Sequence, residues 1–258
     1  MGTWAGLYRS IQAAAAGVTR PSFASIISRV SATLFTRSTL DHELQSIRQD
    51  VLRIGSLVEE QIRQSVRALK ERSAVLARQV VEADARVNDL RYKVEDECLK
   101  CIARQQPTAR DLRQIISCLH IAVELERIGD HAVGIANISL RLGDGPLIKP
   151  LVDIPRMQEL AVGMIHSALD AFIQSDTALA QKVADSDDDI DALYNQMLRE
   201  LLTYMAEDPR TVSGATYLLW VAHNLERIGD RATNLCERVI FTATGALGDY
   251  KQFRPRDE

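Results

Sequence analysis

An internal repeat is the feature that most constrains how this chain can fold. The nine residues ELERIGDHA at 124–132 recur as NLERIGDRA at 224–232, an offset of 100 residues in a chain of 258. Upstream the match continues at an offset of 103, which pairs Ala68 with Ala171. A period of this length indicates one supersecondary unit that is used twice.

Proline spacing and hydrophobic periodicity indicate that each copy is helical. The prolines leave long stretches without proline, such as 22–106 and 156–208, whereas a strand-rich chain needs a turn about every 8–12 residues. Between Ile47 and Leu69, apolar residues recur at the steps of 3 and 4 that are typical of an amphipathic helix. The predicted helices span 41–71, 73–105 and 108–141 in the first copy, and 153–174, 176–206 and 209–246 in the second.

These helices predict an all-α fold of two tandem, pseudo-symmetric, antiparallel three-helix bundles. The first repeat covers 41–145 and the second 153–248, and the Gly- and Pro-rich stretch 142–156 joins them. Residues 1–40 hold four arginines and no acidic residue. We interpret this leader as disordered or as a start assigned too far upstream, with an organellar transit peptide as the alternative.

Composition excludes several classes of function. The net charge of −4 gives no basic balance, so a nucleic-acid binder is not expected. No run of about 18 apolar residues is present, so no segment is predicted to span a membrane. The four cysteines are too few for a disulfide framework and indicate a reducing compartment. The CxxC at 98–101 stands alone and is interpreted as core packing, and nucleotide-binding Gly-rich motifs are missing from the sequence.

The repeated motif Glu-Arg-Ile-Gly-Asp places two carboxylates on one helix face. Glu126 and Asp130 are four residues apart, as are Glu226 and Asp230. Like charges at this spacing cost roughly 0.2–0.5 kcal/mol, and a mid-helix glycine costs about 1 kcal/mol relative to alanine. Both penalties occur twice at matching positions, which favours a functional requirement. The glycine would let another group approach the helix backbone closely.

Folding each hairpin of second and third helices about its turn adds facing side chains. In the first repeat Asp84 faces Asp130 and Asn88 faces Glu126. In the second repeat the facing residues are Asp187 and Asp191. Gathered carboxylates repel one another unless cations neutralise them, and hard or borderline metal ions are the natural cations for oxygen ligands. The predicted metal ligands are Glu126, Asp130, Glu226, Asp230, Asp84, Asp187 and Asp191.

Two readings of this acidic face remain open from the residues alone. In one, each cluster binds metal, and His223, three residues before Glu226, is either a further ligand or a packing histidine. In the other, the carboxylates are a solvated face that pairs with Arg86, Arg91 or Arg231. A purely structural helical module would place Arg or Lys opposite every motif carboxylate.

The doubled LERIGD motif at 125–130 and 225–230 resembles the PhoU family, regulators associated with the high-affinity phosphate transporter of bacteria and archaea. DHEL at 41–44, ARQQPT at 103–108 and YMAED at 204–208 resemble the family as well. The resemblance covers 41–246. It implies metal binding by the four motif carboxylates, with divalent or trivalent iron, zinc, manganese or magnesium as candidate ions.

The family pattern also implies asparagines that flank each motif. The second copy has them as Asn224 and Asn234, whereas the first has Glu124 and Gly134. We therefore expect the first site to differ from the second in affinity or geometry.

The resemblance further implies a non-enzymatic, cytoplasmic and homodimeric adaptor. It would link the phosphate ABC transporter ATPase to a phosphate-sensor histidine kinase, negatively regulate the phosphate-starvation response, and reach the membrane only through these partners. The alternative from another class is a metal-dependent carboxylate-cluster enzyme or a metal-storage helical bundle.

Overall fold

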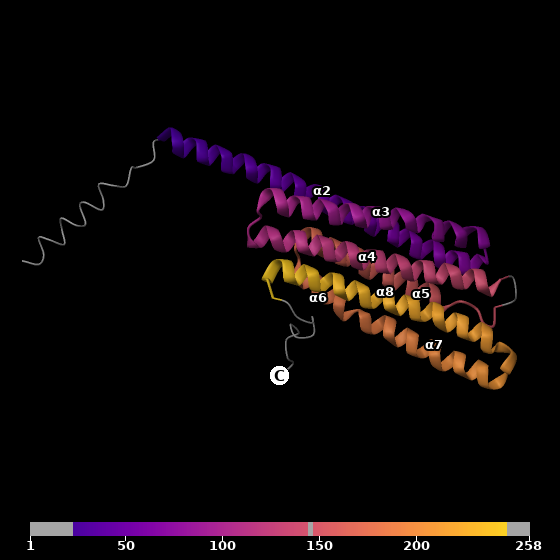
Figure 1. Cartoon of the computed structure of the whole chain (residues 1–258). Helices are drawn as coiled ribbons and strands as arrows, with labels where there is room; N and C mark the ends of the chain where they lie inside the picture. Colours follow the sequence, from indigo (N-terminus) through magenta and orange to yellow (C-terminus); the bar gives the residue numbers. More distant parts are fainter. Residues whose placement is uncertain (1–22, 144–146, 247–258) are drawn as a thin grey trace, which may run out of the picture. The chain divides into compact units, whose positions relative to one another are not determined.

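The computed structural model describes residues 23–143 and 147–246, with side chains from residue 38 onward. Over these residues the chain forms helices and no strand, which confirms the all-α prediction (Figure 1). The elements are α2 (Phe23–Glu71), α3 (Ala74–Gln105), α4 (Ala109–Leu142), α5 (Asp153–Gln174), α6 (Thr177–Asp185), α7 (Asp187–Glu207), the 3-10 turn η1 (Pro209–Thr211) and α8 (Val212–Thr244).

The leader predicted over residues 1–40 lies only partly within the described chain. Its residues 23–40 belong to α2, and the interpretation of the leader as disordered or as a start assigned too far upstream stays a prediction. Residues 1–22 lie outside the described part of the chain. By its internal contacts the chain divides into two compact units, Met1–His42 and Glu43–Glu258, and all sites discussed below belong to the second.

The turn between the first and second helices is built identically in the two repeats. Arg72 and Ser175, 103 residues apart, adopt left-handed φ angles of 57° and 55°. Each is followed by a side chain that caps the next helix: Ser73 accepts a hydrogen bond from the Leu76 amide, and Asp176 accepts from two amides. Capping of this kind typically contributes about 1 kcal/mol of stability. The two repeats therefore share not only their helices but also the capping residue that begins the second helix.

The second helix of the second repeat is broken, which the prediction of one helix over 176–206 missed. α6 ends at Asp185 and α7 begins at Asp187. Between them the Ser186 hydroxyl donates to the Val183 carbonyl at 2.6 Å, a local bond that competes with the helical ladder. The acidic residues that follow favour a new helix N-terminus. The break lies directly beside the predicted second cluster.

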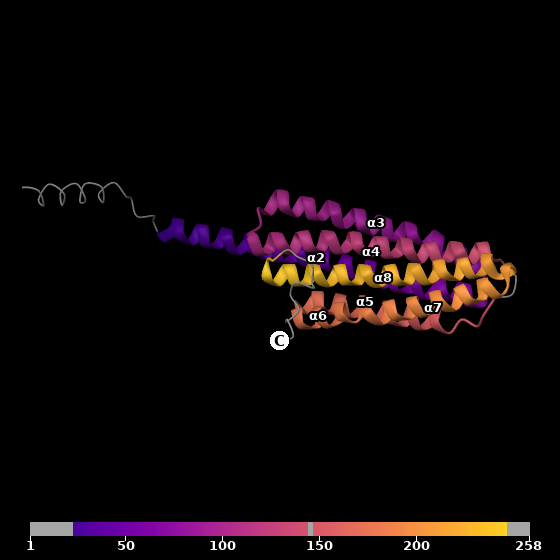
Figure 2. The same ribbon diagram turned by 90° about the horizontal axis from the view of Figure 1, so that it is seen from below.

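The two repeats share one core, because their third helices pack against each other. α4 and α8 run antiparallel side by side, with α3 against α4 and with α5, α6 and α7 against α8 (Figures 1 and 2). Ile121, Leu125 and Ile128 on α4 are fully buried, as are their counterparts on α8. Among the described residues no helix is long and apolar enough to cross a membrane.

Candidate metal centres

The first predicted cluster is assembled from α3 and α4. The Asp84 carboxylate reaches the α4 backbone, where its Oδ1 would lie 3.4 Å from a Cβ added at Gly129. Burial, then the neighbouring charge of Asp130, raise the pKa of Glu126. Burial, then Asp84, raise the pKa of Asp130. Hairpin folding from the sequence therefore placed these three carboxylates correctly near one another.

Two amides hold the Asp84 carboxylate in this cluster. Asn88 donates from Nδ2 to Oδ2 at 3.0 Å, and Gln61 on α2 donates from Nε2 to Oδ1 at 3.3 Å. Gln61 was not among the site residues predicted from the sequence. Gln61 is only 4% exposed. The sequence signal that could have indicated it is a polar amide between Val58 and Ile62 on an otherwise apolar helix face. In the second repeat the equivalent position is Met164.

The second cluster is assembled from α7 and α8 and carries more charge. Asp187 Oδ1 would lie 2.7 Å from a Cβ added at Gly229. Burial, then the charges of Asp191, Asp230 and Glu226, raise the pKa of Asp187 to about 7. Burial, then Asp230, also raise the pKa of Glu226. Where the first cluster has Asn88, this one has the acidic Asp191.

The two mid-helix glycines confirm the predicted close approach to the helix. The group that approaches Gly129 is the Asp84 carboxylate together with the Gln61 amide, and the group that approaches Gly229 is the Asp187 carboxylate. A methyl group at Gly229 would compete with Asp187 Oδ1 for the same space, whereas a methyl group at Gly129 would press on the Gln61 amide oxygen at 3.1 Å. The propensity cost of a helical glycine is therefore offset by access for the facing acid.

Basic side chains neutralise these clusters only in part. Arg227 pairs with Asp230, Nη1 to Oδ2 at 2.5 Å, because the two residues are one helical turn apart. Arg91 pairs with Glu95 at 2.9 Å instead of reaching a motif residue. Within the described chain, four acids of the clusters form no ion pair with Arg or Lys: Glu126, Asp130, Asp187 and Glu226. This contradicts the purely structural alternative, which places Arg or Lys opposite every motif carboxylate.

His223 lies beside the second cluster and is not a buried packing residue. Its ring nitrogen Nδ1 is 3.4 Å from Glu226 Oε2, and its side chain is 53% exposed. The ring also lies 6.0 Å from that of Tyr194, centroid to centroid. His223 is thus placed at the edge of the carboxylate group, with one face toward solvent.

The donor atoms fit a hard or borderline cation in kind. All are oxygens, and two of them, Asp187 Oδ1 and Glu226 Oε2, are buried without a hydrogen-bond partner. A buried acceptor left in this state requires compensation, which a cation supplies. Among the described residues no three His, Cys, Asp or Glu side chains lie close enough to hold one ion. A bound cation would therefore have to draw the mutually repelling carboxylates together.

The flanking positions that differ between the copies lie at the contact between the repeats and not in the clusters. Glu124 on α4 accepts hydrogen bonds from Arg231 and Asn234 on α8, each at 3.1 Å. In the pseudo-symmetric position, His131 contacts Asn224 at 3.0 Å. The Glu124 side chain therefore joins the two third helices, and a difference in affinity between the two sites stays a prediction.

The cysteines are structural, as predicted for the CxxC pair. All four thiols are free and buried. Burial raises the pKa of Cys98 to about 12 and that of Cys101 to about 11. A thiol in such surroundings is neither a metal ligand nor a ready nucleophile.

Fold and clusters together define a two-repeat helical-bundle protein with one carboxylate cluster per repeat, each set against a helical glycine. The PhoU domain family model matches residues 51–139 and 154–239. This chain belongs to the PhoU family.

Related proteins agree over most of the chain. The phosphate-specific transport system accessory protein PhoU homolog of Pseudomonas putida is 40% identical over 223 residues, which cover 85% of this chain and 86% of that protein. The homolog from Aquifex aeolicus is 38% identical, over 84% of this chain and 98% of that one. These relatives are named as accessory proteins, and the family is non-enzymatic, as the resemblance implied.

Solved structures show the same fold. The crystal structure of PhoU from Pseudomonas aeruginosa matches with a TM-score of 0.77 and 40% identity, covering 80% of this chain and 99% of that chain. The phosphate transport system regulatory protein PhoU from Streptococcus pneumoniae matches with a TM-score of 0.76 and 30% identity, covering 81% and 99%.

Proposed function

We propose that this chain is a regulatory accessory protein of phosphate transport whose two carboxylate clusters bind divalent or trivalent metal ions. Family membership and the names of the relatives support the link to phosphate transport. The observation that carries metal binding is that a buried carboxylate oxygen without a partner, Asp187 Oδ1, lies beside the helical glycine Gly229. Iron, manganese, zinc and magnesium are the candidate ions.

The metal would be held between the second and third helices of each repeat. In the first repeat its ligands are Asp84, Glu126 and Asp130, and in the second Asp187, Asp191, Glu226 and Asp230. A bound cation neutralises their repulsion and joins the two helices of the hairpin. Metal occupancy would therefore stiffen each repeat.

The partners of this adaptor are the phosphate ABC transporter ATPase and a phosphate-sensor histidine kinase. Through them the protein restrains the phosphate-starvation response from the cytoplasmic side, acting as a homodimer. Exposed apolar side chains recur at equivalent positions of the two repeats and support docking: Leu99 is 60% exposed and Leu202, 103 residues later, is 52% exposed.

Metal analysis tests the clusters. The Glu126→Ala/Glu226→Ala double variant, loaded with Mn²⁺ and desalted, should retain clearly less metal than the unaltered protein. Glu71→Ala is the matched control, because Glu71 is an exposed acid that pairs with Arg67 away from both clusters. Equal metal content in the double variant and the unaltered protein would overturn metal binding at these residues.

A pull-down from membranes of phosphate-replete cells tests the adaptor role. The unaltered protein should retain the transporter ATPase and the kinase, and the Leu99→Asp/Leu202→Asp variant should retain less of both. Light scattering of the purified protein should give the mass of a dimer. Absence of both partners from the retained fraction would sink the adaptor proposal.

A further inference from the structure

The facing rows of α7 and α8 that form the second cluster continue by one further step, to a tyrosine and a histidine. On α8, His223 lies three residues before Glu226 and therefore on the same helix face. On α7, Tyr194 follows Asp191 by three residues and stands at the same level of the hairpin as His223. The two rings lie 6.0 Å apart, centroid to centroid, with their planes tilted by 49°. A nitrogen-bearing side chain thus stands directly at the end of the second cluster.

The imidazole of His223 faces a cluster oxygen that has no hydrogen bond. Its Nδ1 lies 3.4 Å from Glu226 Oε2, and that oxygen is buried and accepts no hydrogen bond from the described residues. The Glu226 side chain is 19% exposed, whereas that of His223 is 53% exposed. The ring therefore contacts the cluster on one side and remains accessible from solvent on the other. Neutral imidazole is the commonest protein ligand of transition metals and zinc.

At the equivalent level of the first repeat stand an aliphatic and a basic side chain. Val123 on α4 corresponds to His223, and Arg91 on α3 corresponds to Tyr194. Burial chiefly raises the pKa of Glu126, and the positive charge of Arg91 opposes this shift. The same charge disfavours a metal ion nearby, because like charges repel. The two repeats therefore present different neighbours to a bound cation.

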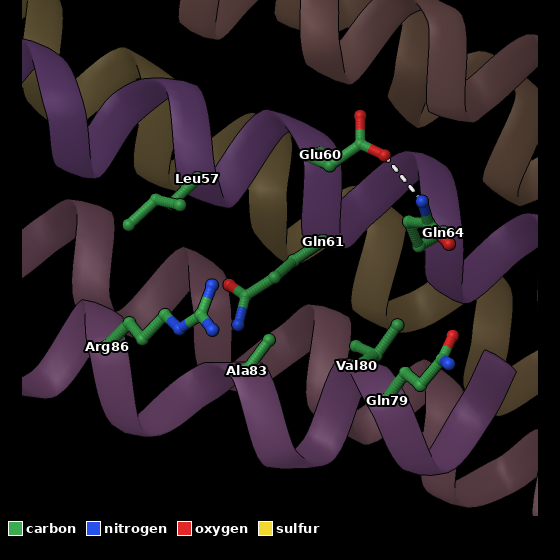
Figure 3. A pocket seen from close by; sticks show the side chains of 8 residues that line it. All are labelled: Leu57, Glu60, Gln61, Gln64, Gln79, Val80, Ala83 and Arg86. Atoms are coloured by element: carbon green, nitrogen blue, oxygen red, sulfur yellow. Dashed lines mark hydrogen bonds between the residues drawn. The ribbon is translucent and has the colours of Figure 1, made fainter. Parts of the chain in front are cut away.

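The first cluster is completed by amides instead. Figure 3 shows the Gln61 side chain reaching from α2 toward α3, where its amide donates to Asp84 Oδ1 at 3.3 Å. Asn88 donates to the other oxygen of the same carboxylate at 3.0 Å. In the second repeat the equivalent residues are Met164 and Asp191. The first repeat thus offers a cation oxygen atoms, which suit hard ions such as Mg²⁺, whereas the second repeat offers oxygen and an imidazole nitrogen.

We propose that His223 is a nitrogen ligand of the metal ion in the second cluster. It makes the second repeat selective for a borderline ion such as Zn²⁺ or Fe²⁺, while the first repeat keeps an all-oxygen site for harder ions. This inference rests on the proposed binding of metal by the clusters. The alternative is that His223 only orients Glu226 through a hydrogen bond, a role that places no nitrogen on the ion.

Pulsed electron paramagnetic resonance of bound Mn²⁺ separates these two roles, because it detects a directly coordinated nitrogen. Glu126→Ala removes a ligand of the first cluster, so that the bound ion reports on the second, and Glu226→Ala does the reverse. Mn²⁺ in Glu126→Ala should show coupling to an imidazole nitrogen, and Mn²⁺ in Glu226→Ala should show none. The coupling should disappear from Glu126→Ala/His223→Val, in which the valine copies the residue of the first repeat.

Competition titrations with Zn²⁺ and Mg²⁺ test the selectivity. In the Glu126→Ala protein, His223→Val should weaken Zn²⁺ binding by at least about tenfold and leave Mg²⁺ binding nearly unchanged. His166→Val is the matched control, because His166 is also an exposed histidine, 67% accessible, and contacts Glu59 outside both clusters. It should change neither affinity. Circular dichroism and the melting temperature in chelator establish that each variant is folded.

Two results would overturn the proposal. One is Mn²⁺ bound at the second cluster without nitrogen coupling, and the other is a Zn²⁺ preference that survives His223→Val. In either case the protein still binds metal, so the proposed function would stand. If the unaltered protein retained no metal at all, the clusters would not be metal centres, and the ligand role of His223 would fall with them.

Discussion

The Asp187 carboxylate lies against the backbone of Gly229, close enough that its Oδ1 would be 2.7 Å from a Cβ added there. The equivalent approach in the first repeat is looser, since Asp84 Oδ1 would be 3.4 Å from a Cβ at Gly129. The glycine of each motif thus works together with an aspartate that comes from another helix.

Gly229→Ala should weaken metal binding while changing stability little. The added methyl group would displace Asp187 Oδ1 and press on Ile190, whose Cδ1 would be 3.0 Å away. Alanine gains about 1 kcal/mol of helix propensity, which offsets part of this strain. Calorimetric titration with Mn²⁺ should show about tenfold weaker binding at one site, equal to about 1.4 kcal/mol.

Gly129→Ala is the matched variant, with a smaller expected effect because its nearest contacts are 3.1 and 3.4 Å. If the two alanine variants bound metal as tightly as the unaltered protein, the glycines would not be needed for the clusters.

Asn88 in the first cluster and Asp191 in the second occupy equivalent positions, and exchanging amide for acid there should change the metal affinity of each cluster. Asn88→Asp removes the hydrogen bond to Asp84 at 3.0 Å and adds a negative charge. We expect it to lower the stability of metal-free protein and to tighten metal binding in the first repeat. Asp191→Asn should weaken binding in the second. Mn²⁺ titrations with unfolding curves in chelator measure both, and unchanged affinities in both variants would contradict this assignment.

The stability of the metal-free protein should fall between about pH 4 and pH 7. The pKa of Asp187 is raised from its ordinary 3.8 to about 7, chiefly by burial, so the folded state holds this proton more tightly than the unfolded chain. The stabilisation is present in full below about pH 4 and is lost as the pH rises through 7. Asp187→Asn should therefore be stabilising at pH 8 relative to the unaltered protein and less so at pH 4.

Urea unfolding at both pH values, in the presence of chelator, measures this difference. Saturating Mn²⁺ should reverse its sign at pH 8, because a bound cation favours the ionised carboxylate. Parallel pH profiles of the unaltered protein and Asp187→Asn would show that this group does not carry the effect.

Glu124 should contribute to the stability of the contact between the repeats. Its side chain is 14% exposed and accepts from Arg231 and Asn234 on α8. Glu124→Ala leaves both donors without their acceptor and should cost about 1–3 kcal/mol in urea unfolding. Arg127→Ala is the control: Arg127 also pairs with Glu124 but is 50% exposed, so its loss should cost at most about 1 kcal/mol.

A double-mutant cycle of Glu124→Ala with Asn234→Ala isolates the pair. Additive effects in that cycle would mean that the hydrogen bond between α4 and α8 contributes nothing measurable.

The native thiols should resist modification. Burial raises the pKa of Cys118 and Cys236 to about 12, so the thiolate that reacts is scarce at pH 8. An aromatic disulfide reagent should label the cysteines slowly in the folded protein and fast in urea. Rapid labelling of a native cysteine at pH 8 would contradict the structural role.

The sequence predicted the helices well where local signals agreed. Proline spacing, the period of 3 and 4, and the capping residues Ser73 and Asp176 are all properties of short segments, and they place the helix starts within a few residues. The break in the second helix at Ser186 was not predicted. The Ser186 hydroxyl donates to the Val183 carbonyl and competes with the helical backbone hydrogen bonds, and a serine in the sequence does not by itself indicate such a bond. The first helix was predicted from residue 41, whereas α2 begins at Phe23, because the acid-free composition before residue 41 was interpreted as that of a leader.

The clusters were predictable because a helical hairpin has simple geometry. Counting from the turn brought Asp84 and Asp187 to the right place opposite the motifs. Gln61 was beyond reach, since it comes from the first helix, whose rotation against the hairpin depends on core packing. The contact of Glu124 with α8 was beyond reach for a related reason, because it joins residues 110 positions apart in the chain.

The sequence by itself determined that this chain is a duplicated three-helix unit with two acidic motifs, because a repeat and a hydrophobic period depend only on the order of residues along the chain. Only the tertiary structure decided that the two units share one core, that two amides hold Asp84 in the first cluster, and that the Glu124 side chain joins the two third helices. Those features depend on which helix faces which, and that choice is made by packing across long separations in the chain.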